Sequence, residues 1–208
     1  KKVPKKVMKI VDFKCPSSNM MDKNDWTIIE QQQNIDIEWL QGTQITPEIM
    51  QLFCEFYQRT YLKRSGHLGY LNMEFFALLH ALMANNLVIM LAKKDDNVIA
   101  ATLSLVGENT LYGRYWGASE EVDSLHFELC YYQGIEFAIK HKLSCFHSGA
   151  QGEHKLQRGY MPQKIWSLHW IKDQQFSKAI EQYLDEETKL LNNQKESLEQ
   201  FAPYKNSN

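Results

Sequence analysis

Residues 87–115 decide the fold; they read L-V-I-M-L-A-K-K-D-D-N-V-I-A-A-T-L-S-L-V-G-E-N-T-L-Y-G-R-Y. Three apolar runs are separated by two polar segments, which read D-D-N and G-E-N. Asp, Asn and Gly favour the backbone conformations of tight turns, and turns this short join neighbouring antiparallel strands. The stretch therefore predicts a three-stranded antiparallel meander, with strands over residues 87–92, 98–106 and 110–115.

Helices and further strands flank the meander on both sides. Upstream, residues 35–40 alternate as in a strand, and amphipathic helices then begin at Thr46 and at Asn72. Downstream, a long helix runs from Asp123 or Ser124 to about His141 and is followed by a strand near Cys145. A glycine-rich loop, a strand over residues 164–171 and a final amphipathic helix that is capped by Asp173 complete the order. We expect an α+β fold, in which helices flank a mixed, mostly antiparallel sheet.

Composition bounds the class of protein. The chain has 208 residues, of which 44% are hydrophobic and 12% aromatic, enough for the core of one domain. The net charge of −2 demands neither nucleic acid nor an anionic membrane as a partner. The sequence shows neither an apolar run of membrane-spanning length nor a signal-peptide pattern, and its four cysteines are scattered, so we expect a cytoplasmic protein with reduced thiols.

The two ends of the chain differ from its middle. Residues 1–14 carry six lysines and one acid, and residues 15–24 are turn-like, which predicts a poorly ordered basic arm or linker over residues 1–33. The sequence beyond residue 188 is polar, which predicts a frayed tail over residues 189–208. The folded domain is then expected over residues 34–188.

The glycine-rich loop is the first candidate site. Residues 147–162 read H-S-G-A-Q-G-E-H-K-L-Q-R-G-Y-M-P. An acid, an imidazole and two cations stand together between two glycines, as Glu153, His154, Lys155 and Arg158. Such a set can provide a general base and anion-binding groups, or it can form an ion-pair cluster that shapes the loop. A metal site is not expected, because Cys145, His147 and His141 lack the spacing of zinc ligands.

Four segments together resemble a known family. They read Y-G-R-Y-W-G at residues 112–117, H-F-E-L-C-Y-Y-Q-G-I-E-F-A at 126–138, G-A-Q-G-E-H-K-L-Q-R-G at 149–159, and H-W at 169–170. This series resembles the FemAB-like family of N-acyltransferases of peptidoglycan biosynthesis or recognition. The element order resembles the Gcn5-related N-acetyltransferase (GNAT) superfamily. Family members typically have two tandem halves, and this chain resembles the C-terminal half, which implies that an N-terminal half is missing.

The resemblance implies transfer of an acyl or aminoacyl group to an amine, with a cell-wall precursor as one possible acceptor. It assigns catalysis to Glu153, His154 and Lys155. It assigns substrate binding to eight residues: Arg114, Tyr115, Trp116, His126, Glu128, Tyr132, Gln151 and Arg158. The polar residues of the long helix, Glu128, Tyr132 and Glu136, recur at spacing four and are expected on one helix face. A non-catalytic module of the same fold that recognises a peptide or glycan precursor is the alternative.

The acyl donor stays open between acyl-CoA and aminoacyl-tRNA. The turn after residue 114 resembles the pyrophosphate-binding turn of the acetyl-CoA-dependent superfamily, but Ser119 stands where a Gly or Ala belongs. Three acids follow it, at Glu120, Glu121 and Asp123, and like charge there opposes anion binding. We therefore expect coenzyme A to bind weakly, whereas the acidic net charge gives no support for tRNA.

Overall fold

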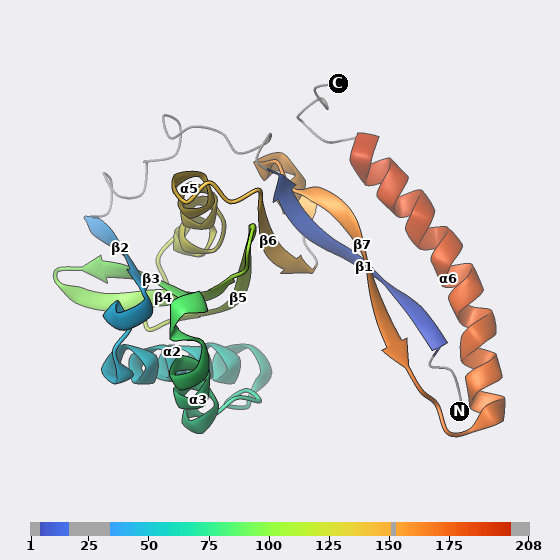
Figure 1. Ribbon diagram of the computed structural model, residues 1–208, viewed down its shortest axis with the longest axis horizontal. Helices are drawn as coiled ribbons and strands as arrows, with labels where there is room; N and C mark the ends of the chain where they lie inside the picture. The colour runs from blue at the N-terminus through green and yellow to red at the C-terminus, as the bar shows by residue number, and fades with distance from the viewer. Residues whose placement is uncertain (1–4, 17–33, 151–152, 201–208) are drawn as a thin grey trace. The chain divides into compact units, whose positions relative to one another are not determined.

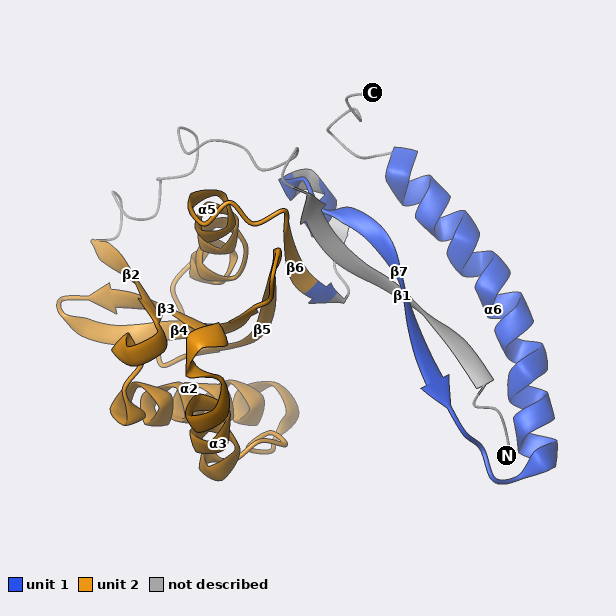
Figure 2. Cartoon of the chain, viewed as in Figure 1, with its two compact units in different colours: residues 1–19, 149–208 blue, residues 20–148 orange. Residues whose placement is uncertain are grey.

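The computed structural model describes residues 5–16, 34–150 and 153–200. The chain divides into two compact units, and each is described by itself (Figure 2). Unit 1 combines both ends of the chain, Lys1–Asn19 and Gly149–Asn208, whereas unit 2 is the continuous segment Met20–Ser148. The chain thus differs from the expected single domain over residues 34–188.

Unit 2 contains a five-stranded sheet with the order β2-β3-β4-β5-β6 (Figure 1). Its strands are β2 (Ile35–Gln41), β3 (Leu87–Lys94), β4 (Asn97–Val106), β5 (Thr110–Ala118) and β6 (Cys145–Ala150). Neighbours from β2 to β5 are antiparallel, and β5 pairs with β6 in parallel. The predicted meander and the mixed, mostly antiparallel sheet are confirmed. Positive φ angles at Asp95 (49°) and Asp96 (64°) form the first predicted turn.

Helices α2 (Pro47–Ser65) and α3 (Met73–Met83) cover one face of this sheet (Figure 1). Both begin at the predicted caps: the Ile49 amide donates to Thr46 Oγ1 at 3.4 Å, and the Phe75 amide donates to Asn72 Oδ1 at 3.0 Å. Buried apolar side chains of both helices pack with the inner strands, among them Phe53, Tyr57, Phe76, Ile89, Ala101 and Leu103.

The opposite face carries one helical segment in three parts: α4 (Leu125–Phe127), the π-helix η5 (Glu128–Tyr132) and α5 (Gln133–Lys140). The predicted span of the long helix is confirmed, but the π-helical turn was not foreseen. Gly134 lies against the ring of Phe146 on β6, so closely that a Cβ there would overlap the ring. None of the helices in the described ranges combines the length and apolar character needed to cross a membrane.

Unit 1 pairs strand β1 (Lys5–Pro16) with β7 (Met161–His169), antiparallel, from Lys5↔His169 to Lys14↔Met161. It also contains η6 (Glu153–Arg158) and the long helix α6 (Gln174–Gln200). The helix begins at the predicted cap, because the Phe176 amide donates to Asp173 Oδ1 at 2.8 Å. Helix α6 contacts both β1 and β7.

Two expectations about the chain ends are wrong where the structure describes them. Residues 5–16 form a strand that pairs with β7, and the β-branched and aromatic residues within V-M-K-I-V-D-F favour that conformation. Residues 189–200 continue α6 because buried Leu191 extends the apolar stripe of Ile180 and Leu184 along the helix. The remainders of the expected arm and tail, residues 1–4, 17–33 and 201–208, lie outside the described residues.

Candidate active site

Three irregularities of the backbone occur close together in unit 2. The β4–β5 register passes from Leu103↔Tyr115 to Ser104↔Gly113, so Arg114 is the extra residue of a β-bulge. The helix that covers this face contains the π-helical turn η5. The parallel pairing of β5 with β6 ends at Tyr112↔His147, although both strands continue. Bulges and π-helical turns each concentrate at functional sites.

Residues of all three irregularities line one cavity of about 150 Å³, called here the small cavity. Its wall comes from β4, β5, the helical segment and the start of β6: Thr102, Leu103, Ser104, Gly113, Arg114, Tyr115, Trp116, His126, Leu129, Cys130, Tyr131, Gly134, Phe146 and Ser148. Of the predicted substrate-binding residues, four therefore meet here: Arg114, Tyr115, Trp116 and His126.

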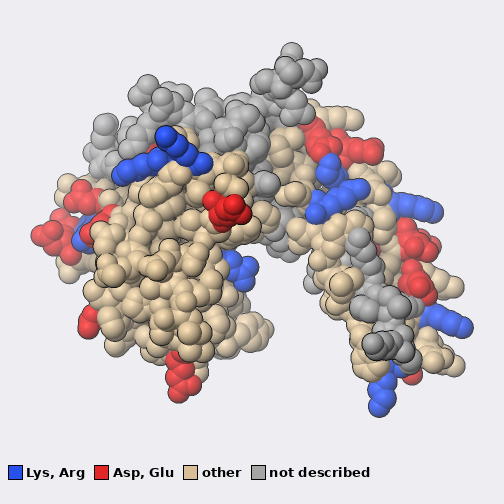
Figure 3. Space-filling view, in the orientation of Figure 1, with Lys and Arg blue, Asp and Glu red and all other residues tan. Residues whose placement is uncertain are grey.

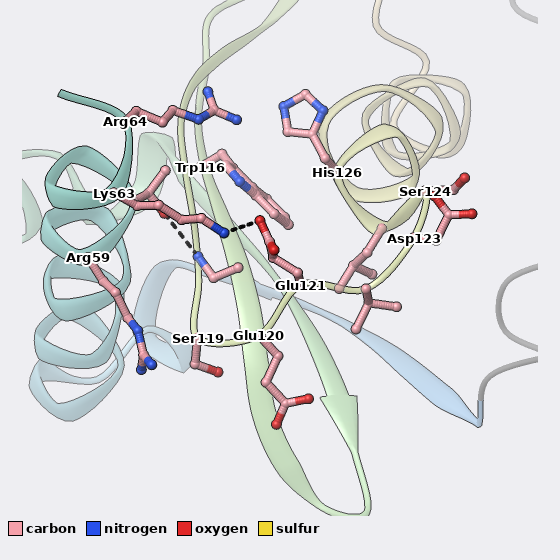
Figure 4. A pocket seen from close by; sticks show the side chains of 14 residues that line it. Arg59, Lys63, Arg64, Trp116, Ser119, Glu120, Glu121, Asp123, Ser124 and His126 are labelled. Carbon is pink, nitrogen blue, oxygen red and sulfur yellow. Dashed lines mark hydrogen bonds and ion pairs between the residues drawn. The ribbon is translucent and has the colours of Figure 1, made fainter.

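A second cavity of about 450 Å³, the large cavity, lies between α2 and the turn that follows β5 (Figure 4). Helix α2 contributes Arg59, Lys63 and Arg64, and the turn between β5 and α4 contributes residues 119–124. Trp116 and His126 line both cavities, with ring centroids 5.3 Å apart and ring planes at 89°. The two cavities are therefore neighbours that share this pair of rings.

Basic side chains from α2 and acidic side chains from the turn both line the large cavity. Lys63 forms an ion pair with Glu121, and this hydrogen bond and charge lower the pKa of the Glu121 carboxyl. The Glu120 carboxylate points away from Lys63, as Figure 4 shows. Arg59 and Arg64 form no ion pair within the described part of the chain. Lys63 therefore compensates part of the negative charge of the turn, which the sequence did not reveal. Weak binding of coenzyme A stays a prediction.

A buried polar chain supports the helical segment. Trp39 Nε1 donates to Gln133 Oε1 at 2.7 Å, and Gln133 Nε2 donates to Glu128 Oε1 at 2.8 Å. Glu128 and Gln133 are each 4% exposed. Because the turn is π-helical, the partner of Glu128 is five residues along the chain rather than four. The predicted helix face, built on a spacing of four residues, therefore missed Gln133. The predicted substrate-binding residues Glu128 and Tyr132 line neither cavity.

The glycine-rich loop belongs to unit 1. Gln151 lies outside the described residues, and the backbones of Glu153 and His154 lie in η6. Lys155 is 2% exposed, and its Nζ donates to the Gly149 carbonyl at 2.8 Å. Gly149 has φ +80°, a conformation that other residues rarely adopt. Lys155 thus holds the loop closed, and its predicted catalytic role stays a prediction, as do those of Glu153 and His154.

Solved structures share the fold at low sequence identity. A crystal structure of FemX matches with a TM-score of 0.54 and 11% identity, covering 68% of this chain and 53% of that chain. L-PGS from Bacillus licheniformis matches with a TM-score of 0.57 and 7% identity, covering 88% and 67%. The GCN5-related glucosamine N-acetyltransferase region of a fungal multi-domain β-N-acetylglucosaminidase matches with a TM-score of 0.54 and 12% identity, covering 78% and 21%.

The chain thus spans about half of the FemX chain. These likenesses confirm the expected GNAT-type acyltransferase fold. A comparison with curated protein sequences finds no match. The sequence model of the FemAB-like family, described as peptidoglycan biosynthesis/recognition, matches residues 23–206. Because that match covers most of the sequence, the chain belongs to the FemAB-like family.

Proposed function

We propose that this chain is an N-acyltransferase, which transfers an acyl or aminoacyl group to the amine of a peptidoglycan precursor. The observation that carries the proposal is the pair of cavities that share Trp116 and His126 at the bulged end of β5. A transferase must hold a carrier group and a reacting acyl group side by side, and two adjoining cavities of unequal size suit that task. The family assignment supports the same chemistry.

Acyl transfer to an amine needs a base for the amine proton, donors that polarise the carbonyl, and a proton for the leaving group. In this proposal the large cavity holds the anionic carrier through Arg59 and Arg64, whose guanidinium groups can each bind an oxyanion through two N–H donors. The small cavity holds the acyl group, and Trp116 and His126 contact the substrate at the junction.

The base is assigned to Glu153 or His154, since either group can be tuned towards neutral pH. Arg158 is assigned to the substrate as a bidentate clamp. Lys155 keeps a part in the catalytic loop through its hydrogen bond to the Gly149 carbonyl. These assignments rest on the family resemblance of residues 149–159.

A non-catalytic module that recognises a peptide or glycan precursor is the second candidate. One observation favours it: the Lys155 ammonium is buried and bonded to the loop backbone, as expected of a group that shapes a loop.

Mass spectrometry separates the two candidates. The protein is incubated with amine-bearing peptidoglycan precursors and either acetyl-CoA or an aminoacyl-tRNA mixture, and the precursors are then weighed. An acyltransferase adds the mass of one acyl unit with one of the donors. A binding module leaves every precursor unchanged while calorimetry still records binding, and that result would refute the enzymatic proposal.

A further inference from the structure

Thr102 on β4 is a buried hydroxyl without a hydrogen bond. Its side chain is 4% exposed, and Oγ1 has no hydrogen-bond partner among the residues that the structure describes. Most buried polar groups in proteins are hydrogen-bonded, because a buried unpaired hydroxyl has lost its bonds to water without replacement. A valine would occupy nearly the same volume without that cost. Thr102 therefore calls for a partner that the described residues do not provide.

The register of β4 shows where that hydroxyl lies. Its neighbours Ala101 and Leu103 belong to the core that packs on α2 and α3. Side chains alternate between the two faces of a strand, so Thr102 and Ser104 lie on the opposite face, beneath the helical segment. Thr102 is paired with Trp116 across the β4–β5 ladder, and Thr102, Ser104 and Trp116 all line the small cavity.

The size and lining of the small cavity limit its ligand. A cavity of about 150 Å³ is of the size that holds a benzene-sized molecule, roughly six non-hydrogen atoms. Its apolar wall includes Leu129 and Phe146, against which a short carbon skeleton can pack. The cavity is too small for a long acyl chain, and its unpaired hydroxyl requires a polar group on the ligand.

We propose that the small cavity binds a short acyl unit carrying a hydroxyl or amino group, and that Thr102 is the residue that recognises this group. The hydroxyl of Thr102 can donate to or accept from either group. The identification of the ligand as an acyl unit rests on the proposed function. The binding of a short polar amide in this cavity is independent of that function. The competing explanation is that a buried water molecule satisfies Thr102.

Three amides of nearly equal shape test the proposal without any carrier or reaction. Lactamide, alaninamide and isobutyramide differ in one position, which is a hydroxyl, an amine or a methyl group. Each is titrated into the full chain, and amide chemical shifts of cavity-lining residues such as Leu103 and Gly113 are followed by NMR. The first two amides distinguish a hydroxyl from an amine as the recognised group.

The variants Thr102→Val and Thr102→Ser make the test specific. The wild type should bind lactamide or alaninamide at least about tenfold more tightly than isobutyramide, since a site built for a polar group rejects the analogue that lacks it. T102V should lose this preference, whereas T102S, which keeps the hydroxyl, should retain it. T102V should also melt no lower than the wild type, because it removes an unpaired buried hydroxyl.

Three results would overturn the proposal: no shifts at the cavity with any amide at tens of millimolar, equal binding of all three amides by the wild type, or an unchanged preference in T102V. Each points to the water explanation or to plain packing. The amide titration measures binding and not turnover. If the wild type prefers the polar amides but transfers no acyl group in the mass-spectrometry experiment, the binding site stands and only the enzymatic function is refuted.

Discussion

At the scale of single residues, two aromatic rings form the junction of the two cavities. Trp116 and His126 line both cavities, and the family resemblance predicts both as substrate-binding residues, a role that stays a prediction. The sequence could not reveal that Lys63 neutralises Glu121, because these residues are 58 positions apart. Charges that look unfavourable in the sequence can therefore be compensated by an element that only the fold brings near.

The loop residues give a prediction at the same scale. Glu153→Gln or His154→Gln should lower turnover by roughly 10²–10⁴-fold at unchanged melting temperature, because glutamine cannot take the amine proton at neutral pH. Arg158→Lys should instead raise the substrate concentration at half-maximal rate, because it loses a bidentate clamp. Steady-state kinetics and thermal melts check both. If all three changes only lower the melting temperature, these residues form a structural cluster with Lys155.

At the scale of helices and strands, local sequence signals correctly predicted the caps and turns that are formed by residues close together in the sequence. Thr46, Asn72 and Asp173 cap their helices as predicted, and the turn at Asp95 and Asp96 joins the first two strands of the meander. Strand β1 was missed because its partner, β7, lies about 150 residues along the chain. The π-helical turn was missed because the 3.6-residue periodicity of apolar side chains does not show that a helix contains one additional residue.

A close approach between α2 and β5 gives the second prediction. A Cβ at Gly117 would overlap the backbone of Phe56 and Tyr57, which cannot move as a side chain can. Gly117→Ala should therefore lower the free energy of unfolding by about 1–3 kcal/mol or more. Gly107→Ala is the matched control: its Cβ would meet the ring of Tyr112, which is 41% exposed and free to turn. Equal losses in chemical denaturation of both variants would contradict this packing.

The end of α5 gives a prediction about pH. The His141 side chain is exposed on one side, and its ring stacks on Phe137 with centroids 4.1 Å apart. This partial burial, followed by the charge of Lys140, lowers the pKa of His141. Below the ordinary histidine pKa of about 6.5, the unfolded chain takes up a proton at this position more readily than the folded one. Stability should therefore fall as the pH drops from about 7.5 to 5.5.

His141→Gln should reduce that dependence on pH, because glutamine does not titrate. Melting temperatures of both proteins at the two pH values measure the difference. A drop of equal size in the variant would show that other groups cause the loss of stability.

At the scale of the whole molecule, both ends of the chain build unit 1, while the cavities lie in unit 2. On the face drawn in Figure 3, Lys and Arg side chains alternate with Asp and Glu in both units, consistent with a net charge of −2. The family resemblance identified the fold from sequence. It also singled out residues that line the small cavity, because motif residues concentrate near β5 and the following helix. Division into two units depends on contacts between distant segments, which motifs do not encode.

Deleting residues 1–16 tests this division. Strand β7 then loses its partner β1, so its amides should exchange with solvent at least about tenfold faster, whereas those of β3 in unit 2 should keep their protection. Hydrogen exchange followed by NMR or mass spectrometry reports both strands in one experiment. Undiminished protection of β7 would show that the N-terminal strand contributes nothing to unit 1.

The central claim is that acyl transfer takes place where the two cavities meet. The most direct measurement is the initial rate of amide formation, by mass spectrometry, for the wild type, Trp116→Ala and His126→Ala, with melting temperatures recorded in parallel. We predict that both variants keep their fold and form product at least about tenfold more slowly, because each has lost a contact with the reacting substrate. Unchanged rates in both variants would place the reaction elsewhere and contradict the proposed function.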